Sequence, residues 1–146
     1  MSRKFAVIVA SVATAWSVGA LGQQADKERV QQEHKAALEK CRGMQDNGRK
    51  ICEAEADGAK KVAEAQAKVQ ERDTPKNRLD LAEAKAEAQY DVAKAKCGDQ
   101  VGDAKNACEK QAKAARDGAL AQAKLDSQKQ GAASSGDSGQ QPAKPQ

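Results

Sequence analysis

The residues with the clearest chemistry in this sequence are four cysteines, which occur as two pairs of equal spacing. Ten residues lie between Cys41 and Cys52, and ten lie between Cys97 and Cys108. Paired thiols can close disulfides, bind a metal ion or exchange electrons with other thiols. Which of these chemistries applies depends on the elements that carry the cysteines and on the compartment of the protein.

The two cysteine pairs belong to an internal repeat with a period of 56 residues. After the second cysteine of each pair, residues recur at spacings of four, three, four and three, which places them on one side of a helix. In the first copy this stripe comprises Cys52, Ala56, Ala59, Ala63 and Gln66. In the second copy it comprises Cys108, Ala112, Ala115, Ala119 and Gln122. We expect both stripes to face into the protein.

A second stripe precedes the first cysteine of each pair. It comprises Val30, His34, Ala37 and Cys41 in one copy, and Ala86, Tyr90, Ala93 and Cys97 in the other. Between the paired cysteines, glycine and aspartate interrupt the helical pattern. The segment Asp73-Thr74-Pro75 separates the copies with a capping side chain and a proline suited to a first helical turn. The pattern predicts helices at 26–43, 49–72, 75–97 and 104–124.

The predicted fold is therefore all-α, with two tandem helical hairpins whose four helices run up and down. The hairpin repeats occupy 23–72 and 73–126. Because the helices on either side of Pro75 have nearly equal length, both cysteine pairs should lie at the same end. A long coiled coil without hairpins is the structural alternative, in which paired cysteines would stand about 16 Å apart and could not bridge.

The first 22 residues have the pattern of a secretory signal peptide, because Arg3 and Lys4 precede an apolar run that ends at Leu21. Cleavage after Ala20 or Gly22 would release a soluble protein into the periplasm. An uncleaved membrane anchor is the alternative, since the run is at the short edge of a membrane span.

The composition of the rest of the chain narrows its class. Without Arg3 and Lys4, 23 of the 25 basic residues remain against 21 acidic ones, and Tyr90 is the sole aromatic left after the leader. This balance argues against a nucleic-acid binder and against a basic membrane helix. We read neighbouring charges such as Asp91 and Lys94 as a solvated helix surface. Residues 127–146 are rich in Gln, Ser, Gly and Pro and should form a disordered tail.

Export to an oxidising compartment favours disulfides as the chemistry of the four cysteines. We predict the pairs Cys41 with Cys52 and Cys97 with Cys108, since each repeat then closes on itself. The alternatives are a four-cysteine metal site or a redox-active module. Metal is disfavoured because zinc ligands usually come in pairs about two to four residues apart. Redox activity is disfavoured because the sequence has no Cys-x-x-Cys motif.

No other motif points to catalysis. His34 is the only histidine, but its repeat counterpart is Tyr90, so we expect both to be bulky packing residues rather than ligands. The sequence holds no phosphate-binding glycine loop and no haem attachment motif. We therefore expect a protein that is not an enzyme and that has no cofactor, metal or catalytic residue.

The segment Gly102-Asp103-Ala104-Lys105-Asn106-Ala107-Cys108, with Cys97 and Tyr90 before it, resembles a group of small secreted proteobacterial proteins. These proteins carry two Cys-turn-Cys repeats in helices rich in Ala, Lys and Glu. No function is assigned to them, although some carry TolA-like or cell-envelope biogenesis labels. The first copy departs from their pattern, because Asn47-Gly48-Arg49-Lys50-Ile51 precedes Cys52. The resemblance implies a Gram-negative periplasm and supplies no catalytic residues.

The expected function is a structural or interaction role in the cell envelope, with protein partners and without nucleic acid or a membrane span after signal cleavage. The alternative function is a cysteine-dependent metal-binding or redox module in the periplasm.

Overall fold

The computed structural model describes the backbone of residues 18–136 and the side chains of residues 26–133. This part of the chain is helical, with α1 at Val18–Arg42, α2 at Asp46–Glu71, α3 at Pro75–Lys96 and α4 at Gly102–Gly136. A short 3-10 turn, η1, follows α3 at Cys97–Asp99. The predicted all-α class and the two helical hairpins are confirmed.

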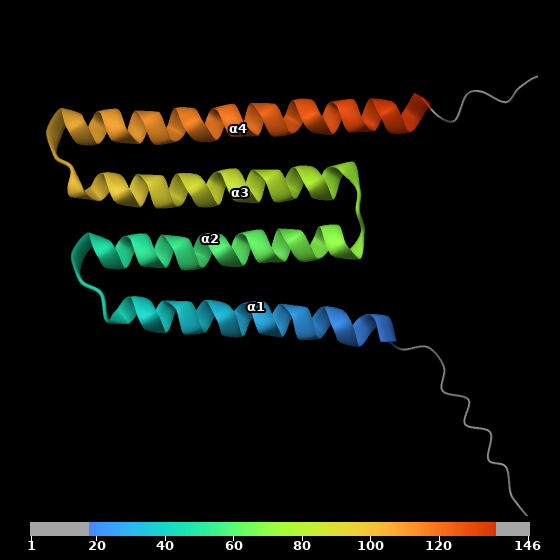
Figure 1. Ribbon diagram of the computed structural model, residues 1–146, viewed down its shortest axis with the longest axis horizontal. Helices are drawn as coiled ribbons and strands as arrows, with labels where there is room; N and C mark the ends of the chain where they lie inside the picture. The colour runs from blue at the N-terminus through green and yellow to red at the C-terminus, as the bar shows by residue number, and fades with distance from the viewer. Residues whose placement is uncertain (1–17, 137–146) are drawn as a thin grey trace, which may run out of the picture.

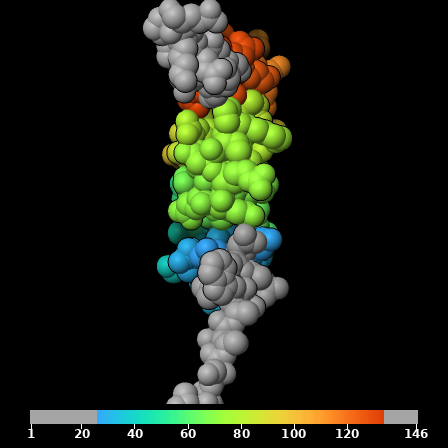
Figure 2. All heavy atoms as spheres, turned by 90° about the vertical axis from the view of Figure 1, so that its right-hand side faces the viewer, coloured from blue at the N-terminus to red at the C-terminus, as the bar shows by residue number. Residues whose placement is uncertain are grey.

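The helices form a single layer rather than a bundle. They lie side by side in chain order (Figure 1), and the view along the layer shows a stack that is one helix deep (Figure 2). Each helix packs on its neighbours in sequence, and the most extensive packing is between α2 and α3. The turns that follow α1 and α3 lie at one end of the layer, and the turn between α2 and α3 lies at the other (Figure 1). The predicted up-down order is therefore confirmed.

The turn between the hairpins is built as the sequence predicted. The Thr74 side chain accepts a hydrogen bond of 3.1 Å from the backbone N–H of Asn77, and Pro75 occupies the first turn of α3. Thr74 thereby caps a helix start that lacks internal partners for its N–H groups. The Asn77 side chain donates to the carbonyl oxygens of Lys68 and Arg72, which satisfies acceptors at the end of α2.

The interior of the layer is thin. Among the described side chains, the buried apolar residues are Val30, Cys41, Ala56, Ala65, Ala86, Cys97 and Ala112. Small residues let the backbones approach closely: a Cβ added to Gly58 of α2 would lie 2.9 Å from the Ala88 Cβ of α3. Since alanine buries little apolar area, at about 25 cal/mol per Å² the hydrophobic term is small. Covalent cross-links are the expected compensation in such a protein.

The observed helix bounds differ from the predicted ones at both ends of the chain. The described part of α1 begins at Val18, within the predicted signal segment, and residues 1–17 lie outside the described residues. At the other end α4 continues past position 124 to Gly136, so helix replaces the expected tail up to that residue. As far as Gln130 the extended helix contacts α3, because Arg78 donates a hydrogen bond of 3.1 Å to the Gln130 side chain. Residues 137–146 lie outside the described residues.

Candidate functional site

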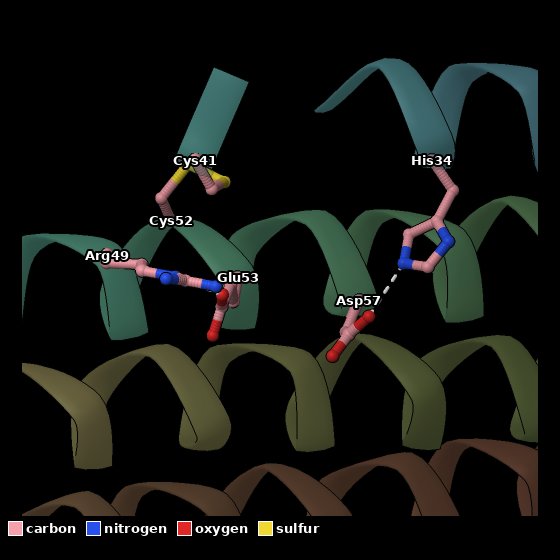
Figure 3. Close-up of a disulfide and its surroundings, with 6 residues drawn as sticks. All are labelled: His34, Cys41, Arg49, Cys52, Glu53 and Asp57. Carbon is pink, nitrogen blue, oxygen red and sulfur yellow. Dashed lines mark hydrogen bonds and ion pairs between the residues drawn. A yellow bond between two sulfur atoms is a disulfide. The ribbon is translucent and has the colours of Figure 1, made fainter. Parts of the chain in front are cut away.

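The four cysteines form the two predicted disulfides. Cys41 at the end of α1 bonds to Cys52 in α2, with a Cα separation of 5.5 Å. Cys97 in η1 bonds to Cys108 in α4, with a Cα separation of 5.7 Å. Both separations fall in the usual range for disulfides. Among the described residues no cysteine is free. Figure 3 shows the first disulfide where it ties the tip of the first hairpin.

The two disulfide-linked tips contact each other. The Asn47 side chain, at the start of α2, donates a hydrogen bond of 2.8 Å to the carbonyl oxygen of Ala95 near the end of α3. The same side chain lies so close to Gly98 that a Cβ there would stand 2.5 Å from the Asn47 Oδ1. The sequence identified Asn47 and Gly98 only as turn residues. Their contact joins the two hairpins at the disulfide end of the layer.

His34 lies between α1 and α2, as the seam pattern predicted. Its side chain is only 14% exposed, and its Nε2 lies 2.6 Å from the Asp57 Oδ1 (Figure 3). Its repeat counterpart Tyr90 is likewise packed against a charged group, since the Arg116 guanidinium of α4 lies over the ring at 4.4 Å from its centroid. Both rings therefore bridge the two helices of their own hairpin. Sequence reasoning missed Asp57 and Arg116 because each belongs to a different helix from its partner.

Pairs of polar or charged side chains cross each junction between neighbouring helices in the described part of the chain. His34 and Asp57 join α1 to α2, and a 2.9 Å contact between the Lys61 Nζ and the Asp91 Oδ2 joins α2 to α3. A 3.7 Å contact between the Arg116 Nε and the Glu87 Oε1 joins α3 to α4. We call these residues the charged row: His34, Asp57, Lys61, Asp91, Glu87 and Arg116.

The charged row lies on one face of the layer. Asp57 and Lys61 are four residues apart in α2, and Glu87 and Asp91 are four apart in α3, so each pair shares a side of its helix. The contact between Lys61 and Asp91 places both sides on the same face. The Asp91 hydrogen bond also raises the pKa of Lys61 above its usual value. Asp91 and Lys94 stay at the surface, as expected for a solvated helix face, but the ion-pair partner of Asp91 is Lys61 across the helix junction.

The other face carries an open groove between α2 and α3. Its walls consist mostly of small apolar residues: Gly58, Ala59, Val62, Ala63, Ala88, Val92 and Ala93. The polar side chains that line it are Glu55 and Gln66 on α2, and Gln89 and Lys96 on α3. We call this surface the α2–α3 groove. Ala59 and Gln66 are two and five positions from Lys61, and such steps lead to roughly the opposite side of a helix. The layer thus has a charged face and an apolar groove on its opposite face.

The stripe that starts at Cys52 was predicted to face inward along its whole length, and this prediction is only partly correct. Cys52 and Ala56 do face the layer, and Ala56 is buried. Ala59 is exposed, and Ala59, Ala63 and Gln66 all line the groove instead of the contact with α1. At about 100° per residue, steps of four and three place successive members of the stripe about 40° and 60° apart around the helix. In a single layer only one side of such a stripe faces the neighbouring helix, and Ala59 lies on the other side, toward the groove.

The inward stripe of the second copy changes in the same way. Ala112 is buried, but Ala115, Ala119 and Gln122 are exposed. The less exposed positions farther along α4 are Arg116, Leu120 and Ala123. The contact face of α4 therefore shifts by one residue after Ala112.

No family model, curated protein or solved structure matches this chain. The resemblance to small secreted proteobacterial proteins stays a prediction. Within residues 26–133, no group of three or more His, Cys, Asp or Glu side chains is arranged to hold a metal ion. Of the described helices, none combines the length and the apolar character that crossing a bilayer requires.

Proposed function

We propose that this protein is a non-enzymatic component of the bacterial periplasm that binds or braces other components of the cell envelope. The observation that carries the proposal is the α2–α3 groove, an open apolar surface on a layer whose opposite face is occupied by the charged row. Apolar and small residues along a helix pair are a common docking surface for a helix of another protein. The periplasmic location in this proposal is supported by the N-terminal segment, whose sequence resembles a secretory signal peptide.

The disulfides agree with this setting. Both lie at one end of a thin layer, and they bond helices whose contact surfaces are rich in alanine. Structural disulfides persist in oxidising compartments, of which the bacterial periplasm is one. Cross-linked tips would keep the layer folded while a partner is absent. A brace of this kind needs a stable shape and no catalytic group.

Cross-linking in cells tests this proposal. A photoreactive amino acid in place of Ala59, in the groove, should give covalent products with envelope proteins that mass spectrometry can identify. The matched control carries the same photoreactive amino acid in place of Glu64, which lies on the same helix with the charged row. We expect products from position 59 that are absent or much weaker from position 64. Recovery of uncross-linked monomer alone from both positions would overturn the proposed role.

A fractionation experiment tests the compartment separately. We expect the protein in the periplasmic fraction, with its N-terminus at Leu21 or Gln23 and no alkylatable thiol under denaturing conditions. Retention in the cytoplasm with an intact Met1 and four alkylatable thiols would contradict the periplasmic assignment.

A further inference from the structure

We propose that the α2–α3 groove is the interface of a homodimer, in which a second copy packs groove to groove. The dimer would bring α2 and α3 of both copies together as an antiparallel four-helix bundle. This inference rests on the proposed interaction role, for which it names a second copy of the chain as one partner. Three features of the structure support it: the shape of the groove, the direction of its helices and the charges on its edges.

The shape of the groove is that of half a helix bundle. Gly58, Ala59, Ala63 and Ala93 keep its walls low, while Val62 and Val92 supply branched apolar side chains. In a bundle, such residues face a central axis and are covered by two further helices. In the single layer Gly58 is buried against α3, Ala59 is exposed, and the two valines and Ala63 and Ala93 are partly exposed. A second α2–α3 pair would cover them with a surface of the same composition.

The helix directions select one orientation of the second copy. α2 and α3 run antiparallel within the layer (Figure 1). Rotation by 180° about an axis parallel to the groove places α2 opposite α3 of the second copy. Every helix in the resulting bundle then has antiparallel neighbours, which is the up-down arrangement of common four-helix bundles. Antiparallel neighbours also bring opposite ends of the helix dipoles together.

The charges on the groove edges match under the same rotation. Glu55 stands on the α2 edge and Lys96 on the α3 edge, both near the disulfide end of the layer. Both side chains are exposed, and among the described residues neither forms an ion pair. The rotation keeps the position of each residue along the helix axes. From the level at which Gly58 meets Ala88, Glu55 stands three residues and Lys96 eight residues toward the disulfide end. Glu55 of each copy therefore lies about 8 Å along the axis from Lys96 of the other, a distance that two long side chains can span. By contrast, the charged row satisfies its charges within one copy.

The available area is sufficient for a dimer. α3 has 22 residues, which corresponds to a length of about 33 Å. Two helices about 10 Å apart present a face about 20 Å wide, or about 660 Å² per copy. Contact along the full length of α3, which extends beyond the residues that line the groove, would bury about 1,300 Å² in total. This lies within the range of about 1,200 to 2,000 Å² for specific protein interfaces.

Sedimentation equilibrium of the disulfide-intact protein tests the inference, with charge-reversed variants as probes. Glu55→Lys would set one lysine against Lys96 of the other copy at each contact, and Lys96→Glu would set one glutamate against Glu55. We expect each variant alone to dimerise at least about tenfold more weakly than the wild type. Glu64→Lys is the matched control, since it makes the same charge change on the side of α2 that bears the charged row. It should leave the dimerisation constant within about twofold of the wild-type value.

Mixing the two variants gives the decisive measurement. In a heterodimer of Glu55→Lys with Lys96→Glu, both intermolecular contacts again join opposite charges, so the mixture should regain dimerisation close to the wild type. A change in the fold of one copy cannot be rescued by mixing. Circular dichroism melts of each variant serve as the folding control. Failure of the mixture to associate more tightly than either variant would overturn the proposed interface.

Two further outcomes separate this inference from the proposed function. A wild-type protein that stays monomeric up to millimolar concentration overturns the homodimer. If cross-linking at position 59 then yields other envelope proteins, the interaction role itself stands. A wild-type dimer that both Glu55→Lys and Lys96→Glu leave unchanged overturns the groove as the interface, whichever partners the cell provides.

Discussion

Asp46 and Gly102 occupy equivalent positions 56 residues apart, and both adopt a left-handed backbone conformation, with φ of 52° and 58°. Each is the first residue of the second helix in its hairpin. The two tips therefore share a backbone turn although the repeat supplies aspartate in one copy and glycine in the other. Glycine adopts this conformation without steric cost, and aspartate is among the few other residues that tolerate it.

We predict that Gly102→Ala destabilises the protein by about 1 to 2 kcal/mol, because alanine in a left-handed conformation brings its Cβ against the backbone. A clash with neighbouring residues is not the cause of this destabilisation, since a Cβ at this position would meet no atom within 4 Å. Gly118→Ala is the matched control in the same helix, where a Cβ also meets nothing within 4 Å. It should stabilise the protein by about 0.5 to 1 kcal/mol. Urea unfolding that gave both variants the same sign would contradict this account of the turn.

Loss of one disulfide should cost about 3 kcal/mol in the free energy of unfolding, because a loop of this length regains chain entropy in the unfolded state. The double variant Cys41→Ala with Cys52→Ala and its counterpart Cys97→Ala with Cys108→Ala should lose similar amounts, since both loops have a sequence separation of 11. Chemical denaturation of each variant without reductant measures the effect. Unchanged stability in both variants would show that the thin interior suffices without cross-links.

We expect Gly58→Ala to destabilise the contact between α2 and α3 by about 1 to 3 kcal/mol, as for other overpacked interiors. The new Cβ would stand 2.9 Å from the Ala88 Cβ, which is too close for two methyl groups. Adding Ala88→Gly to this variant should recover part of the loss by removing the second methyl group. Gly48→Ala, where a Cβ meets nothing within 4 Å, serves as the control. The prediction fails if thermal melts of Gly58→Ala and Gly48→Ala coincide.

The turn between α2 and α3 should respond to acid through Asp73. The Arg78 guanidinium donates a hydrogen bond of 2.7 Å to its carboxylate and holds the pKa of Asp73 below the usual 3.8. A lowered pKa means that this pair stabilises the folded state above the unfolded-state pKa, and that the contribution is lost as the pH falls through the folded-state value. The stabilising contribution of the Asp73–Arg78 pair should therefore be lost only at acid pH.

NMR titration of the Asp73 carboxyl carbon checks this prediction. In Arg78→Met the pKa of Asp73 should rise toward 3.8, because its hydrogen-bond donor is gone. Arg49→Met removes the same charge at the far end of the layer, where Arg49 pairs with Glu53, and should leave the Asp73 titration in place. Equal titration curves for Asp73 in the wild type and in Arg78→Met would contradict the pairing.

The sequence by itself determined the features that depend on local chemistry. Alternating alanine and charged residues favour helix wherever they occur, and Thr74 with Pro75 can begin a helix because the capping bond reaches only to Asn77. The disulfide pairing followed from the repeat, since Cys41 and Cys52 flank a turn whose closure brings them together. These interactions span a few residues or one hairpin, so their partners can be recognised along the chain.

Only the tertiary structure decided how the hairpins combine. The flat layer, the pairing of Lys61 with Asp91 and the α2–α3 groove all involve residues of separate hairpins. Their relative rotation depends on side-chain packing, which decides that Ala56 is buried while Ala59, about 60° around the same helix, is exposed. The extension of α4 has the same origin, since the contact between Gln130 and Arg78 exists only after α4 packs on α3. The spacing of residues along the chain shows which of them share one side of a helix. Tertiary packing decides whether that side contacts another helix or solvent.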